Sequence, residues 1–162
     1  MLVAAIADTH LPRGARRLPD ACRELLAGAD LILHAGDIST RATLDELRAL
    51  GPPVHAVHGN ADEPALRELR PKQLVVEAGG ARIGMVHIPG PAAGREERLV
   101  ARFPGCGAVV FGHTHLPVVE RHGSTWLLNP GSPTERRRGP FHSLLLLEVE
   151  AGAVRPELVR LS

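Results

Sequence analysis

The chain has 162 residues, of which 44% are hydrophobic and 23% are charged, which predicts one globular domain over residues 1–162. Its formal net charge is only +1, which argues against a strongly basic nucleic-acid or membrane surface. Aromatic residues make up 2% of the chain, which argues against a stacking platform for single-stranded nucleic acid.

The sequence predicts a cytoplasmic protein. Cys22 and Cys106 are too few for a disulfide framework, and the first ten residues lack the basic start of a signal peptide. No apolar run approaches the length that spans a membrane. We therefore expect neither a membrane partner nor specific nucleic-acid binding, and a homo-oligomer is compatible with the sequence.

Apolar runs and amphipathic segments alternate along the first half of the chain. The predicted strands are 2–7, 30–37 and 53–60, and the predicted helices are 18–29, 39–51 and 62–70. Ser39 or Thr40 is expected to cap the second helix, and Asp62 or Glu63 the third. Continuous apolar strands separated by helices predict a parallel sheet that is covered on both faces.

The pattern changes in the second half of the chain. Residues 73–87 predict two strands joined by a Gly-Gly turn, and residues 94–103 predict a helix. The segments 106–113, 116–129 and 141–161 predict further strands with glycine turns, in a mixed or antiparallel arrangement. The expected fold class is therefore α/β, with two packed sheets flanked by helices.

Polar motifs stand at the carboxyl ends of five predicted strands, the edge at which ligands bind in open α/β sheets. Together they would deliver two carboxylates, four imidazoles and one amide. These candidate residues are Asp8, His10, Asp37, Asn60, His87, His113 and His115.

This set offers oxygen and nitrogen ligands without a thiolate, which suits Mn, Fe, Zn, Co or Ni. Seven ligands are too many for one ion but fit two ions that share a carboxylate, and two metals about 3.5–4 Å apart are usual in phosphoester hydrolysis. Taken singly, Asp-x-His or Gly-Asn indicates a turn, and His87 indicates a core histidine. The two histidines of "GHTH", one residue apart, are the stronger signal, because buried imidazoles need partners.

The motifs resemble those of the calcineurin-like metallophosphoesterases, and specifically their small, single-domain prokaryotic phosphodiesterase branch. The resemblance spans nearly the whole chain. It is carried in order by "IADTH", "HAGDI", "VHGNADE", "VH", "GHTHLP" and "NPGS". It implies a four-layer α/β/β/α sandwich of two mixed sheets flanked by helices.

The resemblance also implies the ligands of two divalent ions, with manganese expected and iron, zinc, cobalt, nickel or magnesium as alternatives. One ion would be bound by Asp8, His10, Asp37 and His115. The other would be bound by Asp37, Asn60, His87 and His113, so that Asp37 bridges the two.

The implied reaction is attack on a small phosphodiester by a hydroxide that bridges the metals, with Asp37, Asn60 and His113 as catalytic residues. Many phosphatases of the superfamily carry a histidine after this asparagine that can protonate the leaving group. Ala61 stands here instead, which predicts a preference for good leaving groups.

Three further features concern the surroundings of the site. Ile88 and Pro89 replace the Gly-His that often follows the fifth ligand in this family, which predicts a differently shaped loop. The run Arg136–Arg138 follows "NPGS", and Arg138 is a candidate substrate contact because guanidinium suits phosphate. His34 could support Asp37 or could be an ordinary core histidine, and the core role is favoured for His55 and His58.

Two other functions stay open. A phosphomonoesterase or nucleoside-polyphosphate hydrolase would use the same fold and metals. A non-catalytic scaffold would resemble the eukaryotic retromer subunit, which has lost part of the metal site. The complete set of candidate ligands argues against the scaffold.

Overall fold

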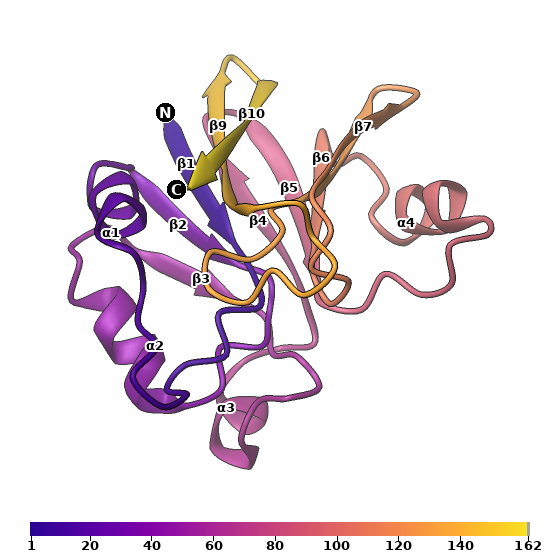
Figure 1. Ribbon diagram of the computed structural model, residues 1–162. Coiled ribbons are helices and arrows are strands. Elements are labelled where there is room, and N and C mark those ends of the chain that lie inside the picture. The colour runs from indigo at the N-terminus through magenta and orange to yellow at the C-terminus, as the bar shows by residue number, and fades with distance from the viewer. Residues whose placement is uncertain (162) are drawn as a thin grey trace.

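The computed structural model describes residues 1–161 and contains four helices and ten strands (Figure 1). The helices are α1 (Asp20–Ala27), α2 (Arg41–Arg48), α3 (Pro64–Leu69) and α4 (Arg95–Arg102). The strands are β1 (Leu2–Ile6), β2 (Leu31–His34), β3 (Val54–Ala56), β4 (Gln73–Ala78), β5 (Ala81–Val86), β6 (Ala108–Phe111), β7 (Val118–His122), β8 (Thr125–Asn129), β9 (His142–Glu150) and β10 (Ala153–Leu161).

The strands form two mixed sheets of five strands each. The first sheet has the order β10-β9-β1-β2-β3, with β1, β2 and β3 parallel, β9 antiparallel to β1, and β10 antiparallel to β9. The second sheet has the order β4-β5-β6-β8-β7, with β5, β6 and β8 parallel and antiparallel strands at both edges.

The two sheets pack face to face, and helices cover the outer faces (Figure 1). Between the sheets, side chains such as Leu33 and Val110 form the largest apolar cluster. Outside the first sheet, Leu26 of α1 and Leu47 of α2 pack on the strands, while Leu99 of α4 packs on the second sheet. The expected α/β/β/α layering is confirmed.

Local sequence signals explain several boundaries. Thr40 caps α2, because its side-chain oxygen accepts a hydrogen bond from the backbone N–H of Thr43 at 3.2 Å. Gly79 and Gly80 have positive φ angles of 55° and 82° in the turn between β4 and β5, a conformation that glycine adopts without steric cost. The predicted hairpin is therefore confirmed.

Two predictions about the first half were wrong, namely the side-chain cap of α3 and the core position of His55. Glu63 occupies the N-cap position of α3, but neither its side chain nor that of Asp62 makes a capping hydrogen bond there. The Asp62 carboxylate accepts from the backbone N–H groups of Ser39 and Gly59, and the Glu63 carboxylate accepts from that of Arg41. Both carboxylates thus tie neighbouring loops together. His55 is exposed on β3 rather than buried in the core.

Helices that could cross a membrane are absent from residues 1–161, since none is both long and apolar enough.

Candidate metal centre

All seven candidate residues follow the carboxyl ends of β1, β2, β3, β5 and β6, where the two sheets meet. Asp8 and His10 follow β1, Asp37 follows β2, and Asn60 follows β3. The second sheet contributes His87 after β5 and two histidines after β6. The structure brings the seven residues into one polar cluster made by both sheets.

Asp8, His10 and His115 form one compact group, and all three are buried. The Nε2 atoms of the two histidines lie 3.3 Å apart, and Asp8 Oδ1 lies 3.4 Å from His115 Nε2 and 3.8 Å from His10 Nε2. Asp8 Oδ1 is buried without a hydrogen-bond partner in residues 1–161. Ligand atoms around an ion with bonds of about 2.0–2.2 Å have similar spacings, so this group fits a divalent metal.

Asp37, His87 and His113 form a second group beside the first. His87 Nε2 lies 3.1 Å from Asp37 Oδ2. The side-chain oxygen of Asn60 joins this group, because it lies 3.1 Å from His87 Nε2 and 3.1 Å from His113 Nδ1. In contrast to the first group, Asn60 and His113 are exposed, so this side of the centre is open.

The Asp37 carboxylate lies between the two groups. Its Oδ2 atom is 3.1 Å from His87 Nε2 and 3.5 Å from His10 Nε2, while its Oδ1 atom accepts a hydrogen bond from the backbone of Ala61. One carboxylate oxygen is therefore within reach of the donors of both groups.

Charges within the cluster shift the pKa values of its members. Burial alone would raise the pKa of Asp37, but the hydrogen bond and the charge of His87 outweigh it and lower this pKa to about 2. Burial likewise opposes protonation of His87, yet Asp37 and Asp8 raise the pKa of this imidazole. Burial lowers the pKa of His115, with Asp8 acting in the opposite direction. The carboxylate is thus ionised and ready to bind a cation.

Hydrogen bonds orient the imidazoles toward the centre. Nδ1 of His87 contacts the carbonyl oxygen of Ala35 at 2.7 Å, and Nδ1 of His115 contacts the carbonyl oxygen of Glu135. A carbonyl oxygen can only accept, so in both rings Nδ1 carries the proton and Nε2 keeps a free lone pair. This arrangement is typical of metal-binding histidines.

The "NPGS" segment holds the loops of the centre in place. The Ser132 hydroxyl donates to the carbonyl oxygen of Asp8 at 2.7 Å, and the Asn129 amide donates to that of Gly112 at 3.2 Å. Both side chains are fully buried. They position the loops that carry Asp8 and His113.

Close packing and unusual backbone conformations accompany the site. A Cβ atom on Gly59 would overlap the Asp37 carboxylate, so only glycine fits there. Five of the seven candidate residues have positive φ angles between 47° and 73°, a region that costs most non-glycine residues free energy. These residues are Asp8, His10, Asp37, His113 and His115. Such conformations concentrate at functional sites.

The sequence of this chain is similar to those of known phosphoesterases. Residues 1–152 match the model of the calcineurin-like phosphoesterase superfamily domain. The chain belongs to this superfamily. It is 37% identical over 153 residues to a probable metallophosphoesterase from Methanocaldococcus jannaschii, covering 93% of this chain and 77% of that protein. It is 34% identical over 165 residues to a probable metallophosphoesterase from Methanothermobacter thermautotrophicus, covering 99% and 92% of the two chains.

Solved structures share this calcineurin-like fold. Wild-type Vps29 from Entamoeba histolytica, crystallised in complex with Zn²⁺, is 27% identical, with a TM-score of 0.79 over 99% of both chains. A Thermotoga maritima protein solved by NMR is 31% identical, with a TM-score of 0.76 over 99% of both chains. The family and the two groups of candidate ligands both indicate that this phosphoesterase binds divalent metal.

Glu135 is a neighbour of the centre that the sequence did not single out. Its Oε2 atom lies 3.6 Å from His10 Nε2, and its Oε1 atom pairs with Arg13 at 2.6 Å. Arg137 lies 3.8 Å from the same carboxylate, whereas Arg138 is exposed. In the "TERRR" segment, Glu135 is therefore the residue that faces the candidate metal centre.

His34 is fully buried beneath the centre. Its Nδ1 atom accepts a hydrogen bond from the backbone N–H of Gly36, so Nε2 carries the proton and donates to the Thr9 hydroxyl at 3.0 Å. Gly36 directly precedes Asp37, and Thr9 lies between Asp8 and His10. His34 thus supports the loops of the centre from below. This position agrees with the hypothesis, drawn from the sequence, that His34 supports Asp37.

We expect His34 to make the metal-free protein less stable in acid. Burial lowers the pKa of His34 to about 3, whereas an unfolded histidine titrates near 6.5. Between these values only the unfolded chain takes up the proton, so the free energy of unfolding falls by up to about 1.4 kcal/mol per pH unit as pH drops below 6.5. Urea unfolding at pH 7 and pH 5.5 should show a smaller loss for His34→Gln than for wild type. Equal losses would contradict this role.

Proposed function

We propose that this protein is a metal-dependent phosphodiesterase with a dinuclear centre, acting as a single domain on a small phosphodiester. The observation that carries the proposal is the position of the Asp37 carboxylate between two groups of candidate metal donors. A carboxylate in this position can bridge two cations and partly neutralise both. Manganese is the metal we propose, because the donors are nitrogen and oxygen without a thiolate.

The proposed first site consists of Asp8, His10, Asp37 and His115, and the second of Asp37, Asn60, His87 and His113. Two bound divalent ions would lower the pKa of a shared water and offset charge on the phosphoryl group. The protein fixes Nε2 of His87 and His115 through the bonds at their Nδ1 atoms. Asn60 and His113 lie at the exposed side of the centre, and their proposed role is contact with substrate oxygens.

The diester preference rests on the residue after Asn60. Ala61 is exposed beside the centre, and its side chain cannot give a proton to a departing group. Protonation of a leaving group is typically worth about 10²–10⁴-fold, so esters of alcohols should be poor substrates here. Arg138 stays a proposed substrate contact on the basis of the sequence.

A phosphomonoesterase or nucleoside-polyphosphate hydrolase of the same fold is the second candidate. A scaffold role is the third, and it is supported by the similarity in fold to Vps29, the protein whose Zn²⁺ complex was solved. The candidate metal donors favour hydrolysis over a scaffold, since all seven lie in the two adjoining groups.

A substrate panel tests these functions. With Mn²⁺, we expect bis(p-nitrophenyl) phosphate to be hydrolysed with a kcat/KM at least about 10²-fold above that for glycerol phosphate, because only the aryl group leaves without protonation. Assays with p-nitrophenyl phosphate and ATP complete the panel. A preference for ATP or for monoesters would favour the second candidate. Metal binding without hydrolysis of any substrate would favour the scaffold.

Ala61→His is the matched variant for the leaving-group argument. A histidine at this exposed position should raise kcat/KM for glycerol phosphate while changing that for the p-nitrophenyl diester little. If both substrates responded equally, missing protonation would not be the cause of the preference.

A further inference from the structure

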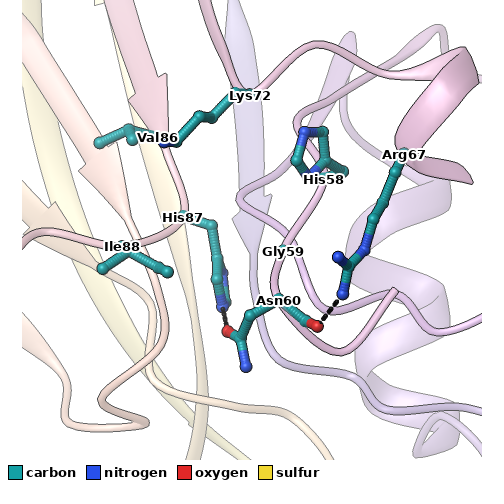
Figure 2. A pocket seen from close by; sticks show the side chains of 8 residues that line it. All are labelled: His58, Gly59, Asn60, Arg67, Lys72, Val86, His87 and Ile88. Carbon is teal, nitrogen blue, oxygen red and sulfur yellow. Dashed lines mark hydrogen bonds between the residues drawn. The ribbon is translucent and has the colours of Figure 1, made fainter. Parts of the chain in front are cut away.

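A pocket of about 80 Å³ adjoins the second group of candidate ligands. Val86, His87 and Ile88 lie on one side of it, and His58, Asn60 and Arg67 on the other (Figure 2). The two sides come from different sheets, because Val86 ends β5 and Asn60 follows β3. His87 and Asn60 belong both to the pocket and to the candidate metal centre, so the pocket adjoins the centre directly.

The walls of the pocket are mainly apolar. Both Val86 and Ile88 line the pocket; Val86 is buried, whereas Ile88 is 41% exposed. Ile88 therefore presents an accessible apolar side chain beside the polar candidate ligands. A volume of about 80 Å³ is several times what one water molecule needs, so the pocket has room for a group larger than water.

Two positively charged side chains, Arg67 and Lys72, line the same pocket. Arg67 is engaged in hydrogen bonds to the protein. Arg67 donates to the carbonyl oxygens of Asp62 and Asn60 and so holds the Asn60 loop. Lys72, the only lysine of the chain, reaches along the wall toward Val86 (Figure 2). Within residues 1–161, no carboxylate lies within salt-bridge distance of Lys72.

We propose that this pocket is a subsite for an aromatic ester group of the phosphoester substrate, with Lys72 contacting an anionic substituent on that ring. The inference rests on the proposed function, because His87 and Asn60 would place the phosphoryl group beside the pocket. Ile88 and Val86 would pack on the ring, as in most ligand sites, where apolar walls and a few polar groups act together. The substrate class is thus an aryl or nucleobase-bearing phosphodiester rather than a dialkyl one.

Equilibrium binding of non-hydrolysable phosphonates tests the subsite without relying on turnover. By calorimetry on the Mn²⁺-loaded protein, phenylphosphonate should bind at least about tenfold more tightly than methylphosphonate, since a few carbon atoms in an apolar pocket give this discrimination. Ile88→Ser should remove most of that preference. 4-Carboxyphenylphosphonate should bind more tightly still, and Lys72→Gln should remove this extra gain while keeping the preference for the ring.

Val119→Ser is the matched control, because Val119 is 38% exposed on β7 and does not line the pocket. It should keep the wild-type preference. Equal binding of phenylphosphonate and methylphosphonate by the wild type would overturn the subsite and leave the phosphodiesterase proposal standing. Absence of a gain from the carboxylate would overturn the role of Lys72. If neither phosphonate bound, the proposed function and the subsite would both fail.

Discussion

Asp37→Asn should lower kcat/KM for bis(p-nitrophenyl) phosphate by at least about a thousandfold and reduce the bound metal below two ions per chain. The substitution keeps the size of the side chain but removes the charge that lies between the two donor groups. Metal ions contribute several kcal/mol to phosphoryl-transfer catalysis, and each 1.36 kcal/mol is tenfold in rate. Elemental analysis of the purified variant and initial rates with added Mn²⁺ give the two readouts.

Asp45→Asn is the control for this loss. Asp45 is a 57% exposed aspartate on α2 that pairs only with Arg48 among residues 1–161, so its neutralisation should leave rate and metal content unchanged. The variant Asp37→Asn is expected to fold, because Oδ1 of asparagine can still accept the hydrogen bond from Ala61. Wild-type rates in Asp37→Asn would show that the reaction does not depend on a bridging carboxylate.

Mn²⁺ should raise the thermal midpoint of the protein by roughly 5–10 °C at a concentration about 100 times the dissociation constant. A ligand that binds only the folded state contributes about 2.7 kcal/mol at that ratio, and a domain of this size gains about 2–4 °C per kcal/mol. The physical source is the buried Asp8 Oδ1 atom, which lacks a hydrogen-bond partner in residues 1–161, together with the repelling carboxylates nearby. Differential scanning calorimetry with and without chelator measures the shift.

The variants His115→Gln and His122→Gln test whether Mn²⁺ stabilises the protein by binding at the candidate centre or at another place. His115 is buried in the first donor group, whereas His122 ends β7 on the far part of the second sheet. In His115→Gln, Mn²⁺ should raise the thermal midpoint much less than in wild type. In His122→Gln, the rise should be the same as in wild type. A shift that survived equally in both variants would mean that the metal binds elsewhere.

Much of the fold was predictable because its signals are local. The buried parallel strands appear as short apolar runs, and Gly79-Gly80 specifies the turn between β4 and β5. The pairing of the last hairpin was not predictable, since β9 joins β1 of the first sheet through contacts more than a hundred residues apart in the chain. The third strand is also shorter than predicted, because residues 57–60 leave the sheet to form the loop that carries Asn60.

The candidate site was predictable at the level of residue types and strand ends. All seven candidate residues lie in one cluster, because parallel strands deliver their carboxyl ends to one edge. Whether each binds metal stays a prediction.

The surroundings of the centre could not be predicted from the sequence. The run of three arginines predicted Arg138 as a substrate contact. In the structure, Arg136 donates to carbonyl oxygens of its own loop, and Glu135 faces His10. The Ser132 hydroxyl accepts from the backbone N–H of Glu135 and so sets this orientation. Such tertiary hydrogen bonds leave no periodic signal in the sequence.

The centre joins side chains that are made at very different times during protein synthesis. Asp8 and His113 are 105 positions apart, and the Glu135 carbonyl that orients His115 follows 20 positions after that histidine. At about 5–20 residues per second, a ribosome needs several seconds to pass from one carboxylate to its partner imidazoles. A nascent chain therefore carries only fragments of each donor group, and we expect metal capture to mark the moment when both sheets have been made and docked.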